Sequence, residues 1–226
     1  MRTIRIDTLN FDERLYPRGG VSEVHVCRLA DALREGGELP PILVDAGNLR
    51  IVDGVHRTRA ARKVFGDDAT IYCELRTYAS DAEFLAAAIE ANSAHGLSFT
   101  PYEHARCAVL AEQVGLAKEV LARAMRMPVT KIERIVTTRT GLTRLRASDP
   151  PILVPLKGSM RACAGRELTE QQLSANRYAG GMPPLYYVNQ LIGLIEAGVL
   201  DNPTEAMAAA LRKLHQLLGQ RVMTVA

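Results

Sequence analysis

The segment 51–61, Ile-Val-Asp-Gly-Val-His-Arg-Thr-Arg-Ala-Ala, constrains the fold of this chain more than any other. The apolar run 49–52 predicts a short buried strand, Asp53-Gly54 predicts a tight turn, and residues 55–65 predict a helix. Free backbone N–H groups and the helix dipole favour an anion at the start of such a helix, and a glycine lets a phosphate approach closely. The segment therefore predicts a phosphate site at Gly54.

Three side chains follow this glycine on the predicted helix. His56 and Arg57 lie in its first turn and add donors suited to phosphate. Arg59 lies two residues beyond Arg57, which rotates it by about 200°, so we expect it on the other side of the helix or against an acidic neighbour. The alternative is a solvated arginine-rich helix behind an ordinary strand-to-helix glycine.

Composition indicates a soluble globular protein. The chain has 226 residues, of which 47% are hydrophobic and 23% charged. It contains no apolar run of membrane-spanning length and no hydrophobic leader, so we expect a cytoplasmic protein without a membrane partner. The cysteines lack a Cys-x-x-Cys pair, so we expect reduced thiols and neither zinc nor disulfides at Cys27, Cys73, Cys107 and Cys163.

Residues 1–98 are predicted to form a small α/β domain. Strand-like and helix-like segments alternate there. The expected strands lie at 3–6, 41–44, 49–52 and 71–75, and the expected helices at 24–34, 55–65 and 81–91.

The segment 51–61 resembles the second conserved box of the ParB family, Gly-Glu-Arg-Arg-x-Arg-Ala, within the ParB/sulfiredoxin superfamily. Gly54, Arg57, Arg59 and Ala60 match that box, whereas Val55 and His56 depart from it. Residues 29–44 resemble the first box, in which a helix, a glycine and a Pro-Ile-x-Val strand follow one another. Residues 91–95 with Pro101 and Glu103 resemble the third box, which leads into the next helix.

This resemblance implies CTP, or another nucleotide, bound with Mg²⁺. The implied nucleotide-binding residues are Gly54, His56, Arg57, Arg59, Asn92 and His95. Asn92 is also the implied metal ligand. Ala91 stands where the family has a glutamate, so we expect hydrolysis to be slow or absent. A binding protein whose nucleotide pocket has decayed is a further alternative. The alternative for Asn92 and His95-Gly96 is a helix C-cap and loop.

Residues 99–150 are predicted to be helical and to contain a helix-turn-helix. Thr100-Pro101 with Glu103 predicts a helix to about residue 114, and helices at 118–125 and 129–139 follow. The stretch 118–146 holds 8 basic and 2 acidic residues, which indicates a polyanion partner.

The helix at 129–139, the second of the helix-turn-helix, is expected to contact double-stranded DNA. Ala122, Ile132 and Ile135 would pack the pair together. The residues left to meet DNA are Thr130, Lys131, Arg134, Thr137, Thr138 and Arg139. A three-helix unit that only packs on its neighbour is the alternative.

Residues 151–226 are expected to continue as helices at 152–164, 169–178, 185–197 and 204–218. The last helix carries an apolar stripe on Ala206, Ala210, Leu211, Leu214, Leu217 and Leu218. This stripe is either internal core or the contact of a homodimer, which we expect because one helix-turn-helix reads few base pairs.

The predicted fold class is α+β: a small ParB/sulfiredoxin-like α/β domain followed by an all-helical region containing a helix-turn-helix. The predicted function is DNA binding with a nucleotide pocket, in plasmid or phage partition or transcription regulation. The main alternative is a small-molecule kinase of this fold using ATP or ADP, with Glu23 as general base. A nuclease would need metal-binding carboxylates, and only Asp53, Glu90 and Asn92 lie near the predicted site.

Overall fold

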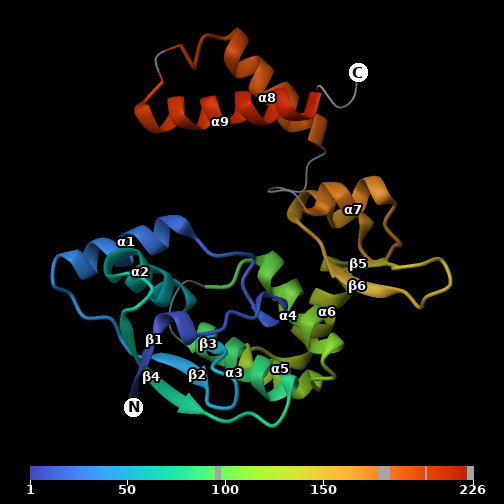
Figure 1. Cartoon of the computed structure of the whole chain (residues 1–226). Helices are drawn as coiled ribbons and strands as arrows, with labels where there is room; N and C mark the ends of the chain where they lie inside the picture. Colours follow the sequence, from blue (N-terminus) through green and yellow to red (C-terminus); the bar gives the residue numbers. More distant parts are fainter. Residues whose placement is uncertain (95–97, 178–183, 202, 223–226) are drawn as a thin grey trace. The chain divides into compact units, whose positions relative to one another are not determined.

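The computed structural model describes residues 1–94, 98–177, 184–201 and 203–222 (Figure 1). The chain forms two compact units, Met1–Gly181 and Met182–Ala226. The first unit contains a four-stranded sheet, a helical region and a two-stranded sheet. The second contains a pair of helices.

The four-stranded sheet has the order β1-β4-β2-β3 and is mixed. Its strands are β1 (Arg2–Arg5), β2 (Ile42–Asp45), β3 (Ile51–Asp53) and β4 (Thr70–Arg76). β4 pairs antiparallel with β1 and parallel with β2, and β2 pairs antiparallel with β3. The predicted strands are confirmed, with ends displaced by up to two residues.

Helices cover the two faces of this sheet. Ile42 and Val44 pack with Val55, the first residue of α2 (Val55–Phe65), whereas the intervening Leu43 packs with Phe84 of α3 (Asp81–Ala94). This alternation follows from the two-residue period of a strand.

A further helix completes this part of the first unit. α1 (Glu23–Arg34) lies beside α2 (Figure 1) and packs on it through small and branched side chains, because Val26 and Ala30 meet Ala60 in one buried cluster. The helix begins at Ser22, whose hydroxyl accepts a hydrogen bond from the His25 N–H.

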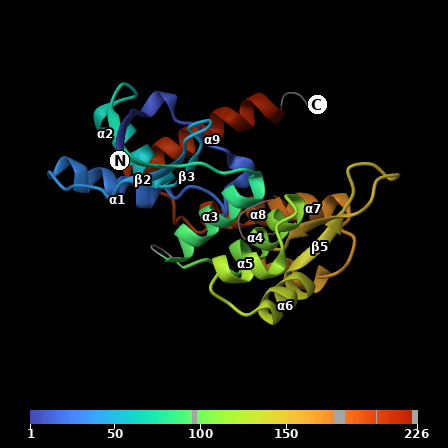
Figure 2. The ribbon, with the colours of Figure 1, turned by 90° about the horizontal axis from the view of Figure 1, so that it is seen from below.

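The helical region contains α4 (Pro101–Gln113), α5 (Lys118–Ala124) and α6 (Val129–Arg139). Thr100 and Glu103 form a capping box that begins α4, as predicted. α5 and α6 confirm the predicted helix-turn-helix pair, and Ala122, Ile132 and Ile135 are buried as expected. Figure 2 shows these helices gathered beside β5.

The prediction that residues 99–226 are wholly helical is wrong. β5 (Thr140–Thr143) follows α6 directly and pairs antiparallel with β6 (Ile152–Pro155), and a 3₁₀ helix, η3 (Gly158–Cys163), comes next. The apolar run 152–154 fits either structure by pattern. Prolines on both sides of it remove backbone donors and disfavour the α conformation, so it forms a strand instead of the expected helix 152–164.

The other predicted helices are confirmed. α7 (Glu170–Arg177) ends the described part of the first unit, and α8 (Pro184–Glu196) and α9 (Glu205–Val222) form the second. On α9, Leu211 and Leu214 are half-buried, while Leu217 and Leu218 are 47% and 50% exposed. The four cysteines are free thiols, as expected. No helix in the described residues is long and apolar enough to cross a membrane.

Candidate functional site: a cavity at the start of α2 and an exposed face of α6

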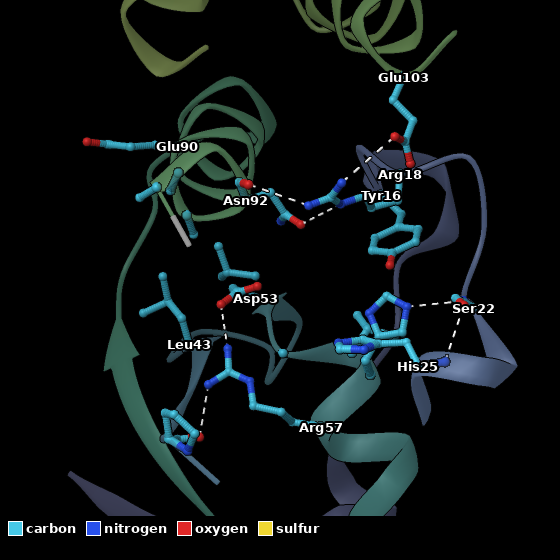
Figure 3. A pocket seen from close by; sticks show the side chains of 18 of the residues that line it. Tyr16, Arg18, Ser22, His25, Leu43, Asp53, Arg57, Glu90, Asn92 and Glu103 are labelled. Atoms are coloured by element: carbon cyan, nitrogen blue, oxygen red, sulfur yellow. Dashed lines mark hydrogen bonds and ion pairs between the residues drawn. The ribbon is translucent and has the colours of Figure 1, made fainter. Parts of the chain in front are cut away.

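A cavity of about 990 Å³ lies at the beginning of α2. Its walls come from the turn before α2, the start of α1, the end of α3 and the start of α4 (Figure 3). The sequence-predicted residues that line it are Gly54, His56, Arg57 and Asn92. The structure therefore brings together the segments that carry the second and third boxes of the resemblance.

Gly54 is required at its position by conformation and by space. Its φ is +104°, a left-handed value that L side chains rarely adopt. An added Cβ would lie 2.8 Å from Cβ of Ile42 and would collide with Cγ2 of the same residue. Gly54 also offers no capping side chain to α2, so the first N–H groups of the helix are left for a ligand or water. This geometry suits a phosphate.

Arg57 is already engaged with the protein. Its guanidinium donates to the carbonyl oxygens of Pro40 and Pro41 at 2.9 and 2.6 Å and to Oδ2 of Asp53 at 2.5 Å. The side chain is 18% exposed. Arg57 therefore ties the chain entering β2 to the turn before α2, and a phosphate would have to compete with these partners.

His56 is held as a hydrogen-bonding group. Its Nε2 accepts a hydrogen bond from the Ser22 N–H at 3.1 Å, and its ring meets that of His25 edge-to-face at 5.0 Å. Burial, followed by the positive charges around the site, lowers the pKa of His56 below its usual value. The neutral ring therefore keeps a proton on Nδ1, so His56 can donate one hydrogen bond.

Arg59 lies outside the cavity, so the structure gives no support to its nucleotide-binding role. It pairs with Glu23 at 3.4 Å and stacks 5.7 Å from the ring centre of Phe11. The acidic neighbour expected from the helical rotation is thus confirmed. The same pair argues against Glu23 as the general base of a kinase, because this 67% exposed carboxylate faces Arg59 and does not line the cavity.

The residues near Asn92 do not fit a metal ion. Oδ1 of Asn92 accepts a hydrogen bond from Nε of Arg18 at 2.9 Å, and Nδ2 donates to the Ala88 carbonyl at 2.8 Å. Glu90 is exposed and points away from Arg18 and Asn92 (Figure 3). Within the described ranges, no three His, Cys, Asp or Glu side chains are grouped closely enough to hold a metal. His95 lies outside the described residues.

Arg18 and Glu103 join the cavity to α4, and the sequence did not reveal this link. The Arg18 guanidinium lies between Asn92 and Glu103, 3.8 Å from Oε2 of the latter (Figure 3). Glu103 also accepts hydrogen bonds from the N–H groups of Gly19 at 3.1 Å and Thr100 at 2.8 Å. The capping-box pattern was the available signal, but it indicates only the helix start.

Arg126 is a further lining residue that the sequence did not reveal. It belongs to the turn between α5 and α6 and has a left-handed φ of 53°. This is an uncommon conformation for a residue with a side chain. The helix-turn-helix therefore contributes directly to the cavity wall.

The predicted DNA-contacting residues lie on the side of α6 that faces solvent. Thr130, Lys131, Arg134, Thr137 and Thr138 are exposed and Arg139 is half-buried. The opposite side of the helix is buried, with Ile132 only 1% exposed. The hydroxyls of Thr137 and Thr138 donate to backbone carbonyls of α6 itself, so the basic side chains are the donors that this face presents to solvent.

Comparison with known proteins gives a family match for the first part of the chain. Residues 1–93 match the family model of the ParB N-terminal domain. The helix-turn-helix follows the matched residues along the chain, in the order that the resemblance implied.

One curated protein and two solved structures are similar to this chain. The transcriptional regulator NovG of Streptomyces niveus is 41% identical over 83 residues, which are 37% of this chain and 24% of NovG. The chromosome-partitioning protein ParB of Caulobacter crescentus, complexed to its centromeric parS site, is 25% identical, with a TM-score of 0.43 over 60% of this chain and 70% of that one. The same protein complexed with CTP-γ-S gives 27% identity and a TM-score of 0.36 over 59% and 75%.

Proposed function

We propose that this chain is a DNA-binding protein that also binds a nucleotide, with CTP as the first candidate. The observation that carries the proposal is the position of the helix-turn-helix. It follows the residues that match the ParB N-terminal domain, and its α6 carries Lys131 and Arg134, which make no ion pair with any described residue. The proposed role is transcription regulation or plasmid or phage partition, and the similarity to a transcriptional regulator favours the first.

The nucleotide proposal is supported by the start of α2. Gly54 leaves the first backbone N–H groups of the helix without a side-chain cap, and His56 adds a neutral donor beside them. The cavity volume of about 990 Å³ is ample for a nucleotide. CTP is named because the segment 51–61 resembles the second ParB box.

We propose nucleotide binding without rapid hydrolysis. Ala91 replaces the family glutamate, Asn92 is held by Arg18, and Glu90 points away from both Arg18 and Asn92 (Figure 3). Metal-assisted hydrolysis therefore lacks a carboxylate positioned beside Asn92 among the described residues (Figure 3). Robust phosphate release from CTP in the presence of duplex DNA would contradict this.

Calorimetry tests the proposal. The full chain is titrated with CTP, ATP and GTP, each with and without Mg²⁺ and a 24-base-pair duplex, a length chosen as roughly two helical turns. We expect one nucleotide to bind and the duplex to bind with strong salt dependence. Failure of all three nucleotides removes the pocket assignment, and failure of the duplex at low salt removes the DNA assignment.

We also propose that the protein binds DNA as a homodimer through the second unit. Several large apolar side chains of α8 and α9 are substantially exposed, including Ile192, Ile195 and Leu218. Light scattering of Leu214→Glu tests this proposal. A folded monomer is expected, whereas an unfolded product would place Leu214 in the core of the unit, and a wild-type monomer on saturating DNA and nucleotide would overturn it.

A further inference from the structure

A second concave surface of the first unit lies between α4, α6 and η3. Its volume is about 490 Å³, and we call it the basic groove. The residues that give it its charge are Lys131, Arg134 and Arg139 of α6 and Arg161 of η3. His104 of α4 lines it as well, and none of its lining residues is Asp or Glu.

The cations of the basic groove have no partners in the part of the chain that the structure describes. In the described ranges, Lys131, Arg134, Arg139 and Arg161 make no ion pair and no side-chain hydrogen bond. The acidic residue on α6, Glu133, lies 4.0 Å from Lys118 instead. Four positive charges around one concavity repel one another, so an anion that enters it is strongly favoured.

The fold holds Arg161 beside α6 although 22 residues separate it from Arg139 along the chain. β6 returns the chain to the end of α6, where the Leu156 N–H donates to the Arg139 carbonyl at 2.8 Å. Leu156 is fully buried. Because this anchor precedes η3 by two residues, the position of η3 against α6 is set by the β5–β6 pair.

A second anchor fixes the same segment from the side of α7. Asn176 accepts a hydrogen bond from the Lys157 N–H at 3.0 Å and donates one to the Pro155 carbonyl at 2.8 Å. Asn176 is itself buried. The segment before η3 is therefore held by the Asn176 side chain as well as by the Leu156 N–H, which fixes the start of the helix that carries the exposed Arg161.

We infer that the basic groove binds one strand of a nucleic-acid phosphate backbone, and that Arg161 is a phosphate-contacting residue outside the helix-turn-helix. The inference rests on the proposed DNA-binding function and extends its surface from α6 to η3. The chemistry decides the occupant: separate guanidinium and ammonium groups along a shallow groove match a series of phosphates better than a single anion. Arg161 and the α6 cations contact phosphates from different elements, which fixes the orientation of α6 on the duplex.

The sharpest test compares Arg161→Gln with Arg166→Gln. Both arginines are exposed and lie five residues apart, but only Arg161 lines the basic groove. Binding of a 24-base-pair duplex, a length of roughly two helical turns, is measured at several salt concentrations, with thermal unfolding as a control for folding. We expect Arg161→Gln to weaken binding about tenfold and to reduce the salt slope by about one unit, and Arg166→Gln to match the wild type.

Lys131→Gln separates this inference from the function on which it rests. If Lys131→Gln weakens binding and Arg161→Gln does not, the helix-turn-helix binds DNA and the extension to η3 is wrong. Equal weakening by Arg161→Gln and Arg166→Gln would show a general charge effect and would also overturn the inference. If the wild type binds no duplex, the proposed DNA-binding function fails before Arg161 is tested.

Discussion

The cavity at the start of α2 and the basic groove are both lined by positively charged side chains, but these side chains are used in opposite ways. In the cavity, Arg57 is bound to three oxygens of the protein and Arg18 lies between Asn92 and Glu103. In the groove, Lys131 and Arg161 make no ion pair and no side-chain hydrogen bond with any residue that the structure describes. The cavity cations hold the site's shape, whereas the groove cations are free to meet a ligand.

This difference changes how the ParB-like motif is interpreted. A matching arginine in a phosphate-binding motif is readily assigned to the phosphate. Here Arg57 secures the backbone around Gly54, and Arg59 secures α2 to α1 through Glu23. The ligand contacts left at the cavity are the backbone N–H groups of α2 and the ring of His56. Substitutions in the two regions should therefore separate stability from affinity.

The largest effect is expected for Gly54→Ala. The new methyl group would collide with Ile42, and the left-handed backbone would be strained, so we expect a loss of roughly 2–4 kcal/mol in the free energy of unfolding. Urea denaturation measures it. Gly20→Ala is the matched control, because Gly20 lines the same cavity and a Cβ there meets nothing within 4 Å. Equal stability of the two variants would refute the packing argument.

Arg57→Ala should come next and should act mainly on stability. The substitution removes three hydrogen bonds of a mostly buried guanidinium and leaves the Pro40 and Pro41 carbonyls and the Asp53 carboxylate without this donor. We expect the free energy of unfolding to fall by roughly 1.5–3 kcal/mol. Arg59→Ala on the same helix breaks an exposed ion pair and should cost less than about 1 kcal/mol. If Arg57→Ala lowered nucleotide affinity at unchanged stability, the guanidinium would be a ligand contact after all.

The double substitution of Lys131 and Arg134 by Gln should give the opposite result. We expect duplex binding to weaken by one to two orders of magnitude and its salt slope to fall by about two units. The free energy of unfolding should change by less than about 0.5 kcal/mol, because both side chains are exposed and unpaired. Arg123→Gln, an exposed change on α5, is the control. An unchanged salt slope would place the DNA site elsewhere.

The smallest effect concerns pH. Burial lowers the pKa of His56 and of His104 below the usual 6.5. The unfolded chain then binds more protons than the folded one as pH falls through 6.5, so folding stability should decrease from pH 7.5 to about 5.5. Urea denaturation at these two pH values measures the loss. Replacing both histidines by Gln should reduce it, and equal loss in that variant would assign it to other groups.

The sequence predicted the elements that local signals determine. These signals involve residues that are close together in the sequence. They are the glycine before α2, the capping box of α4 and the 3.6-residue period of α6. The β5–β6 pair was missed because the run 152–154 is short and wholly apolar, a pattern that helices and strands share.

The candidate site was predictable only in part for a related reason. The turn at Gly54 was predicted from the strand-to-helix pattern, and helix geometry predicted that Arg59 lies on the other side of the helix or against an acidic neighbour, but not that this neighbour is Glu23. The partners of Arg57 and Arg18 depend on where distant segments meet: Arg18 and Glu103 are 85 residues apart in the chain. Arg161 reaches the basic groove only because β6 returns to α6, and that strand was not expected.

Glu103 gives the first unit a kinetic property that its static contacts do not display. One oxygen of this carboxylate accepts the Gly19 N–H at the cavity, and the other accepts the Thr100 N–H at the start of α4. A fluctuation that withdraws Glu103 releases both amides together. Amide hydrogen exchange at Gly19 and Thr100 should therefore share one opening free energy, and Glu103→Gln should speed both by a similar factor.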